Sequence, residues 1–232
     1  MALAMRLDKY LSHMGYGTRK EVKEIIKKGL VVIDDQIIKK PETKVSEDTI
    51  VVVDGMPLQY VSYEYYLLNK PSGYISATQD NHYPTVMDLV FCIRNDCAPV
   101  GRLDLDTEGL LLITNDGQFA HQLLSPKHHV PKKYYVEVEN VLPDNAKEQF
   151  SKPMEFEDFT SSPAEYEQID DTHAYLTIHE GKFHQVKRMF EKIGCPVTYL
   201  QRVEFAFLNL EGVPTGEYRE LTQEEVEQLK TY

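Results

Sequence analysis

The sequence is poor in features that mark several classes of protein. It contains no tryptophan and only three cysteines in 232 residues, and Cys92, Cys97 and Cys195 show no Cys-x-x-Cys spacing. The odd number argues against a disulfide framework, and the spacing gives no zinc-binding pattern. No apolar stretch approaches the roughly 20 residues of a membrane-spanning helix. We therefore expect no bound metal and no contact with a membrane.

The first residues show no secretory signal. Residues 1–6 contain no charged segment that leads into an apolar one, as a signal peptide would. We expect a cytoplasmic protein in which the cysteines stay reduced, as small core or surface residues. With 232 residues the chain is long enough for a sizeable core and for two domains.

Positive charge is scarce overall, but it is not scarce everywhere. The 25 lysines and arginines face 37 aspartates and glutamates, which gives a net charge of −12. This balance disfavours strong non-specific binding to nucleic acid, because phosphate contacts need cations. Residues 1–33, however, contain seven Lys or Arg and only three acids. A basic N-terminal module on an acidic body can still dock on a nucleic acid.

The N-terminal part has the pattern of two short helices followed by strands. Apolar residues at helical spacing predict a helix over residues 6–13. Thr18 and Glu21 form a capping box that begins a second helix, and Gly29 ends it. Strands are predicted at 31–33, 37–38 and 49–53, with a turn at Asp34-Asp35.

The remaining sequence mixes strands and helices without a regular β-α-β alternation. Strands are predicted at 64–68, 134–138, 174–178 and 197–210, and helices at 85–91, 118–124, 144–150, 183–193 and 224–229. Such a mixture favours an α+β fold with a mainly antiparallel sheet. We predict a small domain over residues 1–60 and a larger one over residues 61–232.

The most informative stretch is residues 101–117, where two carboxylates lie between apolar runs. Asp104 and Asp106 occupy a short loop bracketed by glycines, and a buried strand follows. Taken alone, the pattern also fits a hairpin with a solvated acidic loop. Residues 180–190 supply lysine and arginine side chains that could pair with such a carboxylate in a cleft.

Together with residues 132–136, these stretches resemble the pseudouridine synthases that act on ribosomal RNA, and in particular the subfamily that modifies one uridine of 16S small-subunit RNA. The signature of that subfamily, Gly-Arg-Leu-Asp followed by Thr-x-Gly-Leu, is matched at 101–104 and 107–110. The resemblance implies that the larger domain is the catalytic one. Further matches lie at 69–73, 83–86, 125–129 and 216–219, so the resemblance covers essentially the whole chain.

The N-terminal pattern resembles the alpha-L RNA-binding motif of ribosomal small-subunit protein four. In that family the second helix turns its basic face toward structured RNA. One departure is Asp34-Asp35, where the family usually has Asn-Gly. We expect a less relaxed turn there, because Asp tolerates positive φ less well than Gly. The side chains expected to contact RNA are Arg6, Lys9, Arg19, Lys20, Lys23 and Lys27 in this domain, and Lys70, Arg102, Lys132 and Arg188 in the second.

The resemblance implies that the protein isomerises a uridine of 16S rRNA to pseudouridine, on a nucleotide flipped out of its stack. The reaction needs neither a cofactor nor a metal. The resemblance assigns the reacting carboxylate to Asp104, which either attacks C1′ or removes the 2′ proton, and Asp106 is the rival. Lys187 would keep the carboxylate ionised, with Arg188 as the alternative partner. Tyr134 would stack on the uracil.

Three other functions stay open on the sequence alone. The chain could modify a 23S large-subunit uridine, or it could bind rRNA in ribosome assembly without catalysis. It could also hydrolyse a glycoside through Asp104 and Asp106, which the RNA-binding pattern disfavours. We expect 16S rRNA or a small-subunit assembly intermediate as the partner, a monomeric enzyme, and structural roles for His184 and Gln185.

Overall fold

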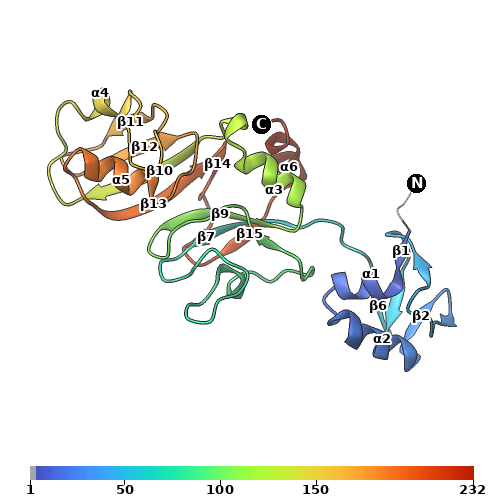
Figure 1. The fold of residues 1–232 in the computed structure, drawn as a ribbon. Coiled ribbons are helices and arrows are strands. Elements are labelled where there is room, and N and C mark those ends of the chain that lie inside the picture. The colour runs from blue at the N-terminus through green and yellow to red at the C-terminus, as the bar shows by residue number, and fades with distance from the viewer. Residues whose placement is uncertain (1–3) are drawn as a thin grey trace. The chain divides into compact units, whose positions relative to one another are not determined.

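The computed structural model describes residues 4–232, which form two compact units (Figure 1). The first contains the described residues up to Glu64 together with Phe91–Cys97. The second contains Tyr65–Val90 and Ala98–Tyr232. Residues 1–3, part of the stretch from which we predicted the lack of a secretory signal, lie outside the described residues.

The first unit packs two helices against short antiparallel strands. A four-stranded sheet has the order β3-β2-β5-β6, and β1 pairs with β4. The core between helices and strands contains Tyr10, Val22, Ile26 and Val51, none of which is exposed. The elements are β1 (Met5–Arg6), α1 (Leu7–His13), α2 (Arg19–Lys27), β2 (Val31–Ile33), β3 (Gln36–Ile37), β4 (Lys44–Val45), β5 (Val51–Val53) and β6 (Met56–Leu58).

Local signals in the sequence set the ends of α2 and the following turn. The predicted capping box is confirmed, because the Glu21 carboxylate accepts from the Thr18 amide at 2.7 Å and the Thr18 hydroxyl accepts from the Glu21 amide. Gly29 has a φ of 76°, as expected after a helix end. Asp34 and Asp35 have φ values of 50° and 61°. Both lie in the left-handed region that favours glycine, which agrees with the predicted strain.

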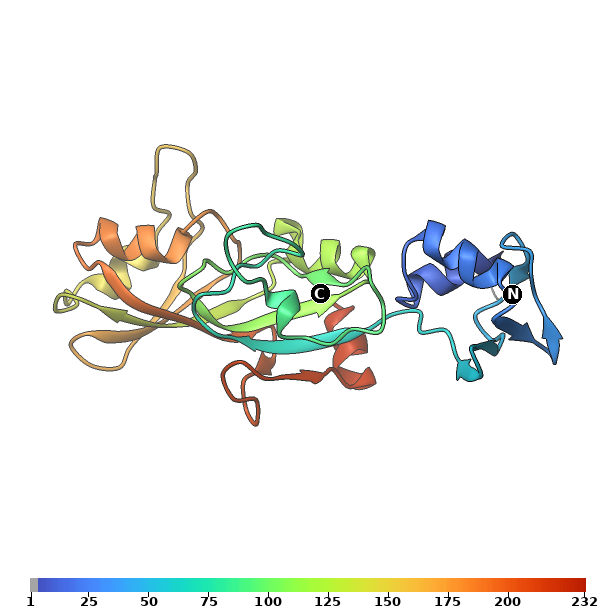
Figure 2. The ribbon, with the colours of Figure 1, turned by 90° about the horizontal axis from the view of Figure 1, so that it is seen from below.

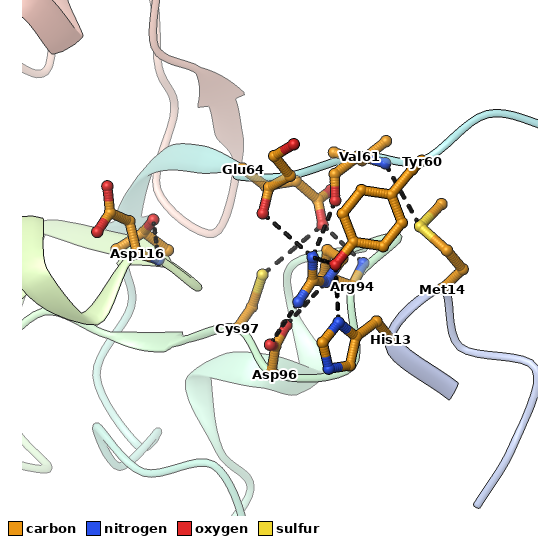
Figure 3. Close-up of polar contacts among 11 residues, drawn as sticks. His13, Met14, Tyr60, Val61, Glu64, Arg94, Asp96, Cys97 and Asp116 are labelled. Carbon is orange, nitrogen blue, oxygen red and sulfur yellow. Dashed lines mark hydrogen bonds and ion pairs between the residues drawn. The ribbon is translucent and has the colours of Figure 1, made fainter. Parts of the chain in front are cut away.

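Residues 91–97 complete the first unit although they follow the first strand of the second (Figure 3). Arg94 is buried, and its guanidinium donates to the Tyr60 hydroxyl at 2.8 Å and to the Val61 carbonyl at 3.0 Å. It also forms a two-point pair with Asp96. The Glu64 carboxylate accepts from the Arg94 amide at 2.6 Å. Charged hydrogen bonds of this kind are among the stronger ones in proteins, and they fasten residues 60–64 to the 91–97 segment.

The second unit is built on one large sheet with the order β11-β12-β10-β13-β9-β7-β15. All pairings are antiparallel except that of β9 with β13, which confirms the predicted α+β class. Two short strands, β8 (Ala98–Pro99) and β14 (Leu208–Asn209), pair with β9 and β13. The strands of the main order are β7 (Tyr65–Lys70), β9 (Glu108–Thr114), β10 (Lys132–Val138), β11 (Glu165–Gln168), β12 (His173–Ile178), β13 (Val197–Phe205) and β15 (Tyr218–Glu220).

Helices cover the sheet at two places. Helices α3 (Gly117–Leu124) and α6 (Gln223–Leu229) lie side by side in Figure 1, and the Gln122 amide donates to the carbonyl oxygens of Lys230 and Tyr232. Helices α4 (Ala146–Phe150) and α5 (Gln185–Lys192) lie at the other end, where the Phe150 and Phe190 rings are 4.8 Å apart. None of the helices within residues 4–232 is long and apolar enough to cross a bilayer. Two short 3₁₀ turns are η1 (Val86–Asp88) and η2 (Pro126–His128).

One helix prediction is wrong in extent. The segment 85–91 forms only the turn η1, which ends at Asp88. The predicted cap is present, since the Asp88 carboxylate accepts from the Thr85 amide at 2.7 Å. The helix does not continue, and from Phe91 to Cys97 the chain belongs to the first unit.

The parallel contact between β9 and β13 depends on a glycine. Gly109 has a φ of 102°, and a Cβ atom at this position would overlap the carbonyl oxygen of Arg202 on β13. Only glycine allows so close an approach of the two backbones. Because residues 102–107 lead directly into β9, this contact fixes where the acidic loop leaves the sheet.

Candidate active site

The acidic loop, residues 102–107, is held in place by a buried lysine. Lys70 ends β7, and its side chain is fully buried. Its Nζ donates to the carbonyl oxygens of Asp104 at 3.0 Å, Leu105 at 3.3 Å and Thr107 at 2.7 Å. Burial lowers the pKa of Lys70 to about 8. The buried ammonium group therefore holds the backbone of the acidic loop in place.

A second set of contacts holds the same loop to the segment after β7. The Ser76 hydroxyl donates to the Leu103 carbonyl at 2.9 Å and accepts from the Leu103 amide at 3.0 Å. The Gly73 amide donates to the Leu105 carbonyl at 2.8 Å. Because both flanks of Asp104 are tied by their backbone, its carboxylate projects from a fixed position.

Two of the lysines predicted to contact RNA, Lys70 and Lys132, have buried side chains. Lys132 is 7% exposed, and its Nζ donates to the Val130 carbonyl at 2.8 Å. The same Nζ lies 5.5 Å from the centre of the Phe205 ring, and burial lowers the pKa of Lys132 to about 8. Neither ammonium group can reach a phosphate in this structure.

Ionisable side chains from two distant segments meet at the acidic loop. Nζ of Lys187 lies 3.2 Å from Oδ2 of Asp104 and 2.7 Å from Oδ1 of Asp106. Nε2 of His184 lies 3.5 Å from Oδ1 of Asp104. The Asp104 side chain is 28% exposed and that of Asp106 is 71% exposed. Asp104 is therefore the more enclosed carboxylate and has a cationic or titratable group at each oxygen.

Asp106 shares the lysine, which lowers its pKa. Partial burial acts to raise the pKa of Asp106, but the hydrogen bond and the positive charge of Lys187 outweigh it. The pKa of Asp106 therefore lies below its usual value. Its greater exposure leaves this carboxylate in contact with solvent, where a charge is stabilised without further help.

Helix α5 places Lys187 by burying its opposite face. Val186, Met189 and Phe190 are buried at helical spacing, as the sequence predicts. Lys187 lies at the side of this buried face, and 24% of its side chain is exposed. Gln185 is buried at the start of the helix, where its side chain accepts from the Lys182 amide and donates to Glu180. This agrees with the structural role predicted for Gln185.

His184, for which we predicted a structural role, contacts the acidic loop. It precedes α5 with a φ of 51°, a left-handed conformation that is uncommon for a residue with a side chain. This conformation turns the imidazole toward Asp104, at the distance given above. Periodicity cannot reveal such a contact, because it depends on a single backbone angle outside the helix. No pattern in the sequence therefore indicates that His184 and Asp104 lie close together.

Tyr134 lies in the middle of the sheet, on the face that α5 covers. It is 7% exposed and is paired in register with Leu176 on β12, which is itself paired with Tyr166 on β11. The Tyr166 ring stacks on Phe150, which contacts α5. Tyr134 forms no hydrogen bond or ion pair with Asp104 or Lys187 in the described part of the chain. The cluster of short contacts therefore includes two of the three predicted catalytic side chains.

Arg188 has its own partner and does not pair with Asp104. Its guanidinium forms a two-point pair with Asp158, at 3.1 and 2.5 Å. It also lies over the rings of Phe156 and Phe159, at 4.9 and 4.8 Å. These residues belong to the arch between α4 and β11 that stands beside α5 in Figure 2. Lys187 is thus the cation at the loop, while Arg102 within the loop is exposed.

Most of the basic side chains predicted for the first unit are exposed. Lys20, Lys23 and Lys27 follow one another at helical spacing on α2, away from the buried Val22 and Ile26. Lys9 and Arg19 are also exposed. Arg6 is exposed too, but its Nε and Nη2 form a two-point pair with Asp8.

Comparison with known proteins identifies this combination of domains. The RNA pseudouridylate synthase family matches residues 64–192, and the S4 domain matches residues 5–51. The chain belongs to the RNA pseudouridylate synthase family. The members of this family are isomerases, so the chain is an RNA-modifying enzyme with an N-terminal S4 domain.

Close relatives cover almost the whole chain. The ribosomal small subunit pseudouridine synthase A of Vibrio cholerae is 40% identical over 96% of this chain and 98% of its own length. The ribosomal large subunit pseudouridine synthase B of Bacillus subtilis is 38% identical over 97% and 95%. A solved pseudouridylate synthase shares the fold with a TM-score of 0.69 and 34% identity, covering 97% of this chain and 99% of that one.

Proposed function

We propose that the enzyme isomerises a uridine of 16S rRNA to pseudouridine and that Asp104 is the reacting carboxylate. The observation that carries the proposal is the pairing of Asp104, on a fixed loop, with Lys187 at 3.2 Å. The ion pair gives the carboxylate a defined partner and position. The Asp104 side chain is 28% exposed, so it is partly shielded from water but still accessible.

The reaction breaks the N1–C1′ bond of the uridine and joins C5 to C1′. The base loses a proton from C5 and gains one at N1, so no electron acceptor and no added group are required. Asp104 acts at the sugar, either by attack on C1′ or by removal of the 2′ proton. Both routes need a carboxylate held at a fixed position, and the Asp104 carboxylate lies 3.2 Å from Nζ of Lys187.

Tyr134 belongs to the same proposal, as the aromatic wall for the uracil. It lies on the sheet face covered by α5, the helix that carries Lys187. The target nucleotide must leave its stack to reach such a site, at a cost of a few kcal/mol. Contact with an aromatic ring restores part of the lost stacking.

RNA docking is proposed for the exposed basic residues of the S4 domain. Lys20, Lys23 and Lys27 on α2, with Lys9 and Arg19 nearby in sequence, form a local positive surface on an acidic protein. Such cations bind phosphates whatever the sequence of the RNA. Arg102 and Arg188 stand closer in sequence to the site and are proposed as phosphate contacts for the target strand, Arg188 after release from Asp158.

The 16S target is favoured by relatives of the small-subunit type, but a large-subunit enzyme is nearly as similar. The test is to incubate the purified enzyme separately with 16S RNA, a small-subunit assembly intermediate and 23S RNA. Pseudouridine is then mapped by carbodiimide treatment and primer extension. A new stop in 16S RNA is expected. A stop in 23S RNA alone would replace the proposed target by a large-subunit uridine, and no stop in any RNA would refute the proposed function.

A further inference from the structure

The most exposed large apolar side chain among the described residues of the second unit lies beside the candidate active site. Phe183 is 72% exposed and immediately precedes His184, which contacts Asp104. Exposure of a single apolar residue is common and by itself indicates nothing. What distinguishes Phe183 is its neighbour, because its ring stacks on the His184 imidazole, with centroids 3.8 Å apart and planes 20° apart.

The turn that carries the two rings is rigid. The Gln185 amide donates to the Lys182 carbonyl at 3.1 Å, and the Gln185 side chain accepts from the Lys182 amide at 3.0 Å. The same side chain donates to Glu180 at 2.7 Å. The hydrogen bonds of the buried Gln185 side chain therefore hold the turn. The left-handed conformation of His184 sets the direction of the His184 and Phe183 rings. An exposed aromatic ring on a braced turn is presented to solvent rather than packed into the core.

The surroundings of the ring match a strand of RNA. Unpaired bases stack on aromatic side chains, while cations beside those side chains bind the phosphates. Lys182 precedes Phe183 and is exposed, and Arg102 on the acidic loop is exposed as well. An exposed ring that follows an exposed lysine in sequence and stacks on the histidine that contacts Asp104 is suited to a nucleotide of the same strand.

We propose that Phe183, backed by His184, is a stacking surface for the base of a nucleotide next to the target uridine. This inference rests on the proposed function and adds a contact that determines which RNA binds. The order of contacts selects the neighbouring base: Asp104 touches His184, and Phe183 lies on the imidazole, one ring farther from the carboxylate. When the target is flipped out, its neighbour loses a stacking partner, and Phe183 replaces it.

The test compares Phe183→Ala, Phe183→Leu and Phe183→Trp with the wild-type enzyme, in single-turnover reactions on the RNA in which the modified uridine has been mapped. We expect the concentration for half-maximal rate to rise about tenfold for the alanine and leucine variants, which corresponds to the loss of one stacked base. The tryptophan variant should bind like the wild type. The maximal rate should change less than twofold, because Phe183 touches no reacting atom.

A second arm assigns the contact to the neighbouring base. The nucleotides 5′ and 3′ of the target are replaced in turn by abasic nucleotides, and the wild type is compared with Phe183→Ala on each RNA. On one of the two abasic RNAs the penalty of the alanine variant should disappear. Val141→Ala, at a side chain that is 67% exposed in the same unit, is the control for truncation of a surface apolar residue and should behave like the wild type.

Several results would overturn the inference. These are an unchanged half-maximal concentration for Phe183→Ala, a leucine variant equal to the wild type, or a penalty that persists on both abasic RNAs. A persistent penalty would mean that the ring acts on something other than the base of a neighbouring nucleotide. If the wild-type enzyme modifies no RNA, the proposed function fails and this inference fails with it. An active wild type with an unaffected alanine variant refutes the stacking surface alone.

Discussion

Replacing Lys70 by methionine tests whether the buried ammonium group holds the acidic loop. Methionine has a similar length and fills the same space without a donor. In the wild type, Nζ lies within hydrogen-bond distance of four carbonyl oxygens, those of Pro71, Asp104, Leu105 and Thr107. The variant leaves these acceptors without that donor while the apolar packing of the side chain is kept.

The expected loss follows from two opposing effects. Three N–H groups can satisfy three carbonyls, and a buried acceptor left without a partner costs about 2 kcal/mol. Against this, the fall of the Lys70 pKa from 10.5 to about 8 means that keeping the buried lysine charged costs about 3.5 kcal/mol. The net loss in the free energy of unfolding is then about 2.5 kcal/mol. For a protein of this size it lowers the melting temperature by about 8 °C.

Lys132→Met is the matched control. This lysine is also buried and its pKa is also about 8, but Nζ donates to a single carbonyl oxygen, that of Val130. By the same arithmetic, removal of its buried charge outweighs the loss of one bond, so we expect the variant to be more stable than the wild type by about 1.5 kcal/mol. Calorimetric melting and single-turnover pseudouridine formation are measured for both variants. For Lys70→Met the maximal rate should fall about 100-fold, because the loop carboxylates lose their fixed position. Equal melting temperatures and rates for the two variants would show that the Lys70 ammonium group does not hold the acidic loop.

Three further predictions follow from other contacts. Lys20→Glu combined with Lys23→Glu should weaken RNA binding and flatten its salt dependence in filter binding, and an unchanged slope would exclude α2 as a contact surface. Gly109→Ala should destabilise by more than about 3 kcal/mol in thermal unfolding, because its Cβ would overlap the Arg202 carbonyl; Gly117→Ala, with open space around it, is the control. The lowered pKa values of Lys70 and Lys132 mean that the unfolded chain binds more protons between pH 8 and 10.5. The free energy of unfolding of the wild type should therefore rise across this range relative to the Lys70→Met, Lys132→Met double variant, and a constant difference would contradict the burial of the two charges.

Local signals in the sequence predicted the elements that carry their own caps and apolar stripes. Thr18 and Glu21 define the start of α2, and the spacing of Val186, Met189 and Phe190 defines the buried face of α5. The short strands β4, β6 and β15 were not predicted. Each has two or three residues and is defined by its partner strand, so no periodicity within it can be recognised.

Other features depend on contacts between distant residues and have no local signal. A lysine on a strand is normally exposed, and only the carbonyls gathered around Lys70 explain its burial. The packing of residues 91–97 into the first unit likewise depends on Arg94 meeting Tyr60 and residues 61–62. The pairing of Asp104 with Lys187 was expected from family resemblance, whereas the contact of His184 with the same carboxylate was not.

The central claim is that the enclosed carboxylate at position 104, rather than its exposed neighbour, reacts with the ribose. The most direct measurement compares Asp104→Asn with Asp106→Asn in single-turnover pseudouridine formation on the mapped RNA, with RNA binding measured in parallel. Both substitutions keep the size of the side chain and remove one carboxylate charge near Lys187. We expect Asp104→Asn to bind RNA but to form no pseudouridine, and Asp106→Asn to keep a rate within about tenfold of the wild type. Pseudouridine formed by Asp104→Asn at a rate near that of the wild type would contradict this claim.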